Sequence, residues 1–235
     1  MIISIIIPVF NEENFVKELL IRINKIKEIK KEIIIVNDCS TDKTRVILEN
    51  ECEHLYSKII HNKRNMGKGY SCRKGIQEAT GGIIIIQDAD LEYNPENYIK
   101  LIEPIISNET QVVYGSRVLP GGTRTRPKTF DFIIRYFANF FLTFLSNLLN
   151  GQNLSDCHTC YKVFLTSIIK NIDLKENGFC FCPEVTAKVS RLKIKIKEVP
   201  IDYYGRTHRE GKKIVYFDGL RAIFSIIKYN LFKKT

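Results

Sequence analysis

The chain has 235 residues, of which 44% are hydrophobic, and its formal net charge is +10. This composition is typical of a soluble globular protein with one large α/β domain or two small ones, and the charge favours polyanionic partners: nucleic acid, nucleotide diphosphates or an anionic membrane surface. Residues 1–10 are too short and too uncharged at their start for a secretory signal, and the seven cysteines lack a regular disulfide spacing, so we expect a reducing cytoplasm and free thiols.

The first half of the chain alternates short apolar runs with longer amphipathic segments. The apolar runs predict strands at 2–7, 32–36, 58–61 and 83–87, and the segments between them predict helices over 12–28, 42–53 and 68–79. Strands that alternate with helices in this way imply right-handed crossovers and a parallel sheet. Ligands of such sheets bind beyond the carboxyl ends of the strands.

Polar motifs follow three of these strands, so they should meet at that edge of the sheet. They are PVFNEE at 8–13, VNDCSTD at 36–42 and QDADLE at 87–92. Thr41 and Asp42 fit helix capping, whereas Asp38 lies closer to the strand end, where its carboxylate could accept a base N–H or a ribose hydroxyl. Lys68 lies between two glycines at a predicted helix start, a setting that favours anion binding without matching the phosphate loop of ATPases.

The third motif places three carboxylates, Asp88, Asp90 and Glu92, directly after four consecutive isoleucines. If the backbone stays extended, the three side chains project to one side, where their like charges require a cation between them. Hard oxygen ligands on a short acidic loop suit Mg²⁺ or Mn²⁺. The alternative is a solvated acidic turn.

The second half begins with a predicted strand at 112–117 that ends in Arg117. Residues 130–149 then form an amphipathic pattern with a stripe rich in phenylalanine, interrupted by polar residues including Asp131 and Arg135, which argues against a membrane span. This helix either lies in the interfacial plane of a bilayer or faces the core, and the pattern does not choose. The C-terminal segment 217–232 is predicted to be a second peripheral amphipathic helix.

Seven segments of the chain resemble, in order, the family 2 inverting glycosyltransferases of GT-A fold, in the branch of dolichyl-phosphate mannose and glucose synthases. They are IIIPVFNEE, EIIIVNDCSTD, NMGKGYSCRKGIQEATGGIIIIQDADLE, VVYGSR, LSDCHTCYKVF, GFCFCPEVTAK and IKEVPIDYYGRTHREGKKI. Two positions depart from the usual pattern. Asn37 stands where a carboxylate is common, and Glu92 stands where the mannose synthases often carry Gln.

The resemblance implies an α/β fold with a mixed, mainly parallel sheet over 1–214, and a C-terminal helix at 215–235 packed on the domain or the membrane. It implies a nucleotide-sugar pocket and a divalent metal site, Mg²⁺ or Mn²⁺, on Asp88, Asp90 and Glu92. The pocket residues would be Pro8, Asn11, Glu12, Asn37, Asp38, Lys68, Asp88 and Ala89.

The implied reaction moves a sugar from a UDP- or GDP-sugar to a polyprenyl phosphate at the cytoplasmic face of a membrane, where the protein is peripherally bound. The residues expected to stabilise the leaving phosphate or act on the acceptor are Asp90, Arg117, Arg206, Lys212 and Lys213. An ionised acceptor phosphate needs no general base, whereas a hydroxyl acceptor would need one. Asp156 and Glu184 are the available carboxylates, and each could instead orient a basic residue or a loop.

Several alternatives stay open on the sequence. A transferase acting on a hydroxyl of a polysaccharide or lipid is the nearest enzyme alternative. In the leading interpretation, the charged segment 203–214 is expected to close over the phosphates of donor and acceptor. No nucleic-acid partner is expected, because the chain lacks an aromatic RNP strand, a zinc finger and a helix-turn-helix signature. Zinc is not expected on the cysteine pairs at 157–160 and 180–182, because the C-x-C pair is poorly spaced for it and both pairs lie in segments that the resemblance explains without metal.

Overall fold

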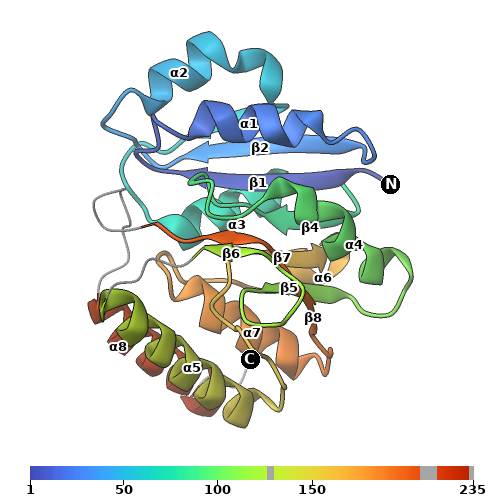
Figure 1. Cartoon of the computed structure of the whole chain (residues 1–235), viewed down its shortest axis with the longest axis vertical. Coiled ribbons are helices and arrows are strands. Elements are labelled where there is room, and N and C mark those ends of the chain that lie inside the picture. Colours follow the sequence, from blue (N-terminus) through green and yellow to red (C-terminus); the bar gives the residue numbers. More distant parts are fainter. Residues whose placement is uncertain (126–129, 207–215, 233–235) are drawn as a thin grey trace.

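A seven-stranded mixed sheet forms the centre of the computed structural model, which describes residues 1–125, 130–206 and 216–232 (Figure 1). The strand order is β3-β2-β1-β4-β7-β5-β8, and every neighbouring pair is parallel except the two that β7 makes with β4 and β5. The strands are β1 (Ile3–Val9), β2 (Lys31–Asn37), β3 (Lys58–His61), β4 (Ile83–Ile86), β5 (Val112–Ser116), β7 (Lys162–Leu165) and β8 (Lys197–Pro200). The predicted mixed, mainly parallel α/β fold is confirmed.

The central strands are buried on both faces, which explains their continuous runs of β-branched residues. All four isoleucines of β4 are at most 1% exposed. Helix α3 approaches β1 closely because Gly75 has no side chain: a Cβ there would lie 2.3 Å from Cγ2 of Ile6. A glycine inside a helix costs roughly 1 kcal/mol relative to alanine, and here it is offset by close packing of helix on sheet.

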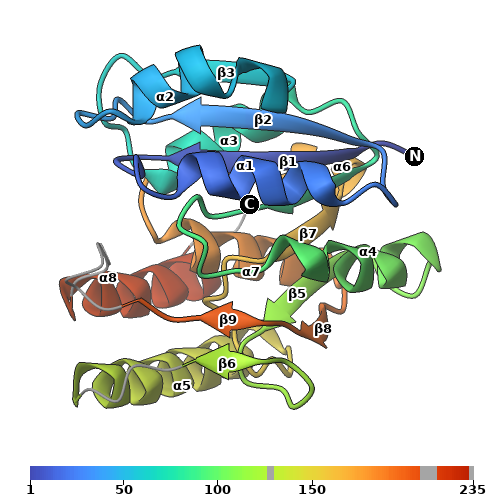
Figure 2. The same ribbon diagram turned by 45° about the horizontal axis from the view of Figure 1, so that its top comes forward.

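Helices cover both faces of the sheet and one end of the molecule. They are α1 (Val16–Lys25), α2 (Thr44–Glu51), η1 (Glu53–Leu55), α3 (Lys68–Glu78), η2 (Pro95–Asn97), α4 (Tyr98–Ile106), α5 (Phe130–Asn150), α6 (Thr166–Lys170), α7 (Phe181–Arg191), α8 (Tyr216–Ile227) and η4 (Lys228–Phe232). A two-stranded ribbon pairs β6 (Arg124–Thr125) with β9 (Tyr203–Tyr204), as Figure 2 shows. The strands and helices predicted from the sequence are present, with ends shifted by at most four residues and with α8 and η4 together covering the predicted C-terminal helix.

Helices α5 and α8 pack on each other at the lower end of Figure 1 through a small cluster separate from the main core, formed by Leu142, Ala222 and Ile226. Helix α7 contacts both of them. The outward face of the pair is apolar and exposed, with Phe140 67%, Phe144 58% and Phe224 69% accessible. The phenylalanine stripe of α5 therefore does not face the core of the described protein.

Candidate active site

A cavity of about 990 Å³ opens beyond the carboxyl ends of β1, β2 and β4 and extends to α5 and α8. The three polar motifs meet there, as expected for a parallel sheet. The predicted site residues that line it are Pro8, Glu12, Asp38, Lys68, Asp88, Ala89, Asp90, Glu92, Arg117, Asp156 and Arg206. Asn11, Asn37 and Glu184 are not among its lining residues, and Lys212 and Lys213 lie outside the described residues.

The acidic loop brings its carboxylates together by a turn and not by an extended backbone. Leu91 has φ +58°, and the backbone N–H of Glu92 donates to Oδ1 of Asp90 over 3.1 Å. The backbone of this loop is therefore not extended, contrary to the prediction, although the charges do converge. Burial and the charges of Asp88 and Glu92 raise the pKa of Asp90 to about 7.

Two cations of the protein face these carboxylates. Nζ of Lys68 lies 2.5 Å from Oδ1 of Asp88. Burial alone would raise the pKa of Asp88, but the charge and hydrogen bond of Lys68, the hydrogen bond of Cys160 and the charge of Arg117 together lower it. The guanidinium of Arg206 lies 2.9 Å from Asp90, 3.3 Å from Glu12 and 3.6 Å from Glu92. In this arrangement no group of three His, Cys, Asp or Glu residues in the described ranges is set out to hold a metal ion.

The donor set nevertheless suits a divalent ion. Asp88, Asp90 and Glu92 offer hard carboxylate oxygens on one short loop, and the charges of Asp88 and Glu92 add to burial in disfavouring the ionised form of Asp90. Tyr203 from β9 donates to Oε2 of Glu92 over 2.7 Å, which orients that carboxylate. The residues fit Mg²⁺ or Mn²⁺ when the side chains of Lys68 and Arg206 move away from the carboxylates that they contact.

Asp38 organises the glycine loop that begins α3. Its Oδ1 accepts from the N–H of Met66 over 2.9 Å, and its Oδ2 accepts from the N–H of Gly67 over 2.7 Å. Asn37 and Asn11 make hydrogen bonds to the loop that follows β2. Oδ1 of Asn37 accepts from the hydroxyl of Ser40, and Oδ1 of Asn11 accepts from the N–H of Thr41. These three residues shape the strand ends.

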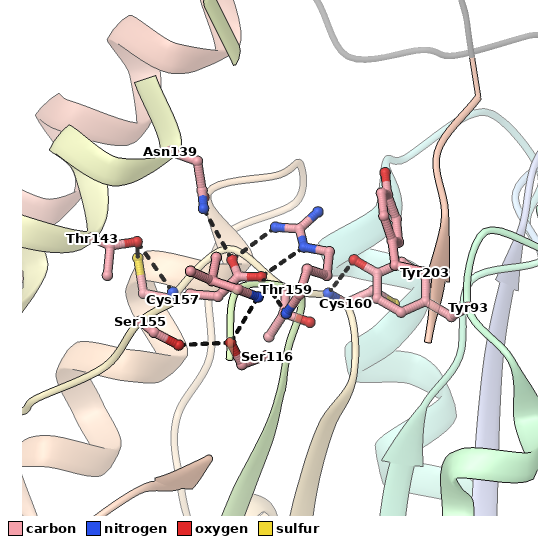
Figure 3. Close-up of polar contacts among 12 residues, drawn as sticks. Tyr93, Ser116, Asn139, Thr143, Ser155, Cys157, Thr159, Cys160 and Tyr203 are labelled. Atoms are coloured by element: carbon pink, nitrogen blue, oxygen red, sulfur yellow. Dashed lines mark hydrogen bonds and ion pairs between the residues drawn. The ribbon is translucent and has the colours of Figure 1, made fainter. Parts of the chain in front are cut away.

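Arg117 and Asp156 form a two-pronged ion pair at the far wall of the cavity. Nε and Nη2 of Arg117 lie 2.7 and 2.8 Å from the two oxygens of Asp156, which is fully buried. Asn139 of α5 donates to the same carboxylate, and Figure 3 shows it reaching down from the helix. Arg117 also lies over the ring of Tyr203, 5.3 Å from its centroid. Asp156 thus orients Arg117 in this structure.

The loop that carries Asp156 is fixed on both sides. Ser155 and Ser116 share a hydrogen bond of 2.6 Å, and the N–H of Cys160 donates to the hydroxyl of Tyr93 (Figure 3). His158 of this loop also lines the cavity. Burial and the charges of Lys162 and Arg117 lower the pKa of His158 to about 4, so its imidazole is neutral at physiological pH.

Glu184 of α7 is completely buried away from the cavity. Its Oε1 accepts from the N–H of Lys175 and from Nζ of Lys188, and its Oε2 accepts from the N–H of Glu176. These contacts match the second role left open by the sequence, which was orientation of a loop.

Tyr93, His158 and the segment 175–180, which forms the wall of the cavity beside α3, were not expected as site residues from the sequence. Only the glycine and aromatic residues of the motif GFCFCPEVTAK signalled that this wall carries site residues. The remaining wall residues, Lys175 to Asn177, show no distinctive pattern in the sequence.

The family model described as Glycosyl transferase family 2 matches residues 4–173. The chain belongs to glycosyl transferase family 2. This match confirms the family expected from the sequence and the assignment as a glycosyltransferase. A dolichol-phosphate mannosyltransferase of Pyrococcus furiosus is 28% identical over 232 residues, which cover 97% of this chain and 64% of that protein. An undecaprenyl-phosphate mannosyltransferase of Micrococcus luteus is 26% identical over 66% of this chain and 63% of its own.

The family 2 chain therefore spans just under two thirds of the length of these relatives. A solved structure of glucosyl-3-phosphoglycerate synthase from Mycobacterium tuberculosis, in complex with Mn²⁺, uridine diphosphate and glucosyl-3-phosphoglycerate, superposes with a TM-score of 0.72. The match covers 99% of this chain and 81% of that chain at 15% identity. At this identity the likeness shows the fold alone, which is GT-A.

Proposed function

We propose that this protein transfers a sugar from a nucleoside diphosphate sugar to a polyprenyl phosphate while bound to a membrane surface. The observation that carries the proposal is the continuity of the cavity of about 990 Å³, which joins the acidic loop to the helix pair α5 and α8. A charged donor and a lipid-linked acceptor would meet in that cavity. The names of the two mannosyltransferase relatives support the same acceptor class.

The donor would occupy the end of the cavity near the strands. Asp38 and Lys68 lie where a nucleoside and its diphosphate would reach the N-terminus of α3, whose N–H groups and dipole favour anions. Asp88, Asp90 and Glu92 would hold the divalent ion. When bound, that ion neutralises the negative charge that develops on the departing diphosphate.

The acceptor would enter between α5 and α8, where the lining includes Ile134, Leu142 and Ala222. The exposed outer face of the pair provides the contact with lipid, and its aromatic side chains suit the interfacial region of a bilayer. By length and composition alone, Phe132–Asn150 could cross a membrane. Its packing against α8 through Leu142 favours a helix that lies along the surface.

The chemistry needs no proton acceptor, because a phosphate oxygen of the acceptor is already ionised at neutral pH. Arg117 lies at the wall between the acidic loop and α5, where its guanidinium can pair with a phosphate while Asp156 fixes its orientation. Attack on the anomeric carbon from the side opposite the diphosphate inverts its configuration. Arg206 can then follow the negative charge onto the leaving group.

A donor and acceptor screen tests this proposal. The purified chain is incubated with Mn²⁺, UDP- or GDP-sugars and short-chain polyprenyl phosphates, and the products are identified by mass spectrometry. A lipid phosphate that gains one sugar is the expected result. Transfer only to hydroxyl acceptors, such as oligosaccharides offered in a parallel series, would contradict the proposed acceptor while keeping the donor.

A further inference from the structure

The C-terminal turn of the described chain contacts the wall of the cavity next to α3. The hydroxyl of Tyr229 donates to Oε1 of Glu176 over 2.7 Å, and Nζ of Lys228 lies 2.7 Å from the same oxygen. Tyr229 is fully buried, and its carbonyl accepts a hydrogen bond from Arg191 of α7. The turn is thus anchored independently of Glu176, and it provides a fixed point to which Glu176 is attached.

Glu176 belongs to the segment 174–178, which lies against the first turn of α3. A Cβ on Gly69 would be 2.4 Å from the carbonyl oxygen of Glu176, and one on Gly67 would be 2.5 Å from that of Asn177. The carbonyl of Asn177 also accepts from the N–H of Tyr70 over 3.0 Å. The two backbones touch with no side chain between them, so a shift of the segment must shift the start of α3.

We propose that Lys228 and Tyr229 are positioning residues for nucleotide binding, acting through Glu176 on the Gly67–Gly69 turn. The inference rests on the proposed function, because it takes the N-terminus of α3 as the place of the donor diphosphate. Backbone N–H groups bind phosphate well only when they are fixed in direction before the ligand arrives. Two contacts on one carboxylate oxygen, one of them charged, add from the C-terminal turn to the fixation that Glu184 gives the backbone of the same segment.

Calorimetric titration with UDP and with GDP in the presence of Mn²⁺ tests the inference on the full chain. The variants are Tyr229→Phe, which removes one hydroxyl, and Lys228→Met combined with it. We expect the double variant to lose affinity by about tenfold, with a higher KM for the donor and an unchanged kcat. Replacing Lys228 by Arg instead of Met in the double variant should restore part of the affinity for the nucleotide. Asn230→Ala is the matched control, because Asn230 lies in the same turn and donates to Ile226 instead.

Hydrogen exchange of residues 67–73 in the ligand-free protein gives a second readout that needs no nucleotide. Faster exchange there in the double variant, with the core strands unchanged, is expected. Equal exchange and equal nucleotide affinity in variant and wild type would overturn the inference while leaving the proposed function intact. If wild type binds neither nucleotide, the donor assignment fails, and the exchange rates alone decide whether the turn positions α3.

Discussion

Nη2 of Arg206 lies 2.9 Å from Oδ2 of Asp90, and the same guanidinium reaches Glu12 and Glu92. The protein thus places one of its own cations on the carboxylates that we assign to the divalent ion. From the sequence we expected Arg206 to bind phosphate. In the proposed reaction Arg206 contacts the carboxylates first and the phosphate later, since its guanidinium must leave the carboxylates when the ion binds them.

Replacing Arg206 by Lys should therefore lower activity by at least about tenfold, although the charge is kept. The planar guanidinium contacts several acceptors at once, and an ammonium on a flexible stem cannot reproduce this geometry. Initial rates at subsaturating donor and acceptor measure the effect. Arg45→Lys, on the exposed face of α2, is the control. Wild-type rates in Arg206→Lys would contradict a role in the reaction.

Replacing Asp90 by Asn should abolish turnover and weaken Mn²⁺ binding, because an amide cannot supply the charge that a hard cation requires. The fold should not suffer, since the substitution relieves repulsion between partly buried carboxylates. Mn²⁺ titration followed by electron paramagnetic resonance, together with a thermal melt, checks both statements. Glu103→Gln, an exposed position on α4, makes the same chemical change as a control. Full activity in excess EDTA would remove the metal from the mechanism.

Replacing Asp156 by Asn should destabilise the protein by about 3 kcal/mol, because it leaves the guanidinium of Arg117 without its buried counter-ion. Activity should fall as well, through misplacement of Arg117. A double-mutant cycle with Arg117→Ala separates this role from that of a general base. If Asp156 acts through Arg117, its replacement costs little more in the Arg117→Ala background, whereas a general base would cost its full factor there.

His158 should make stability depend on pH. Its pKa is lowered from the ordinary 6.5 to about 4, so the unfolded chain takes up a proton first as the pH falls. The stability that a neutral His158 contributes is complete above pH about 6.5 and is lost between that value and 4, by about 2 kcal/mol at pH 5. His158→Gln should show a smaller fall in melting temperature between neutral pH and pH 5. An identical fall would show that the folded protein does not lower the pKa of His158.

Replacing Phe140 and Phe144 together by Ser should reduce binding to phosphatidylcholine–phosphatidylglycerol vesicles by more than tenfold, because each buried phenylalanine contributes roughly 1.5–3 kcal/mol. Co-sedimentation measures the bound fraction. Val46→Ser, which removes an exposed apolar residue from α2, is the control. A carbonate wash should release the wild type from membranes, and retention would show that α5 is inserted across the bilayer.

The parallel half of the fold was predictable because each strand is a local run of β-branched residues and each helix has a local period. The antiparallel strand β7 was not, since Lys162 reads as polar although it is buried, with its ammonium donating to the carbonyls of Cys157 and Thr159. In the site, the strand-end motifs identified the carboxylates. The basic residues that pair with these carboxylates could not be identified in the same way, because they are distant in the sequence. The contact of Arg206 with Glu12, for example, joins residues 194 positions apart.

The position of β7 between β4 and β5 fixes the order in which the protein can be completed during synthesis. Residues 1–106 contain β1 to β4 and their helices, so a nascent chain can form this part of the sheet early. The edge of β4 stays unpaired until residue 165 has emerged, and β5 gains its first neighbour only then. An apolar edge open for that time is prone to pairing with other chains. Expression at lower temperature, or with added chaperone, should therefore raise the soluble yield.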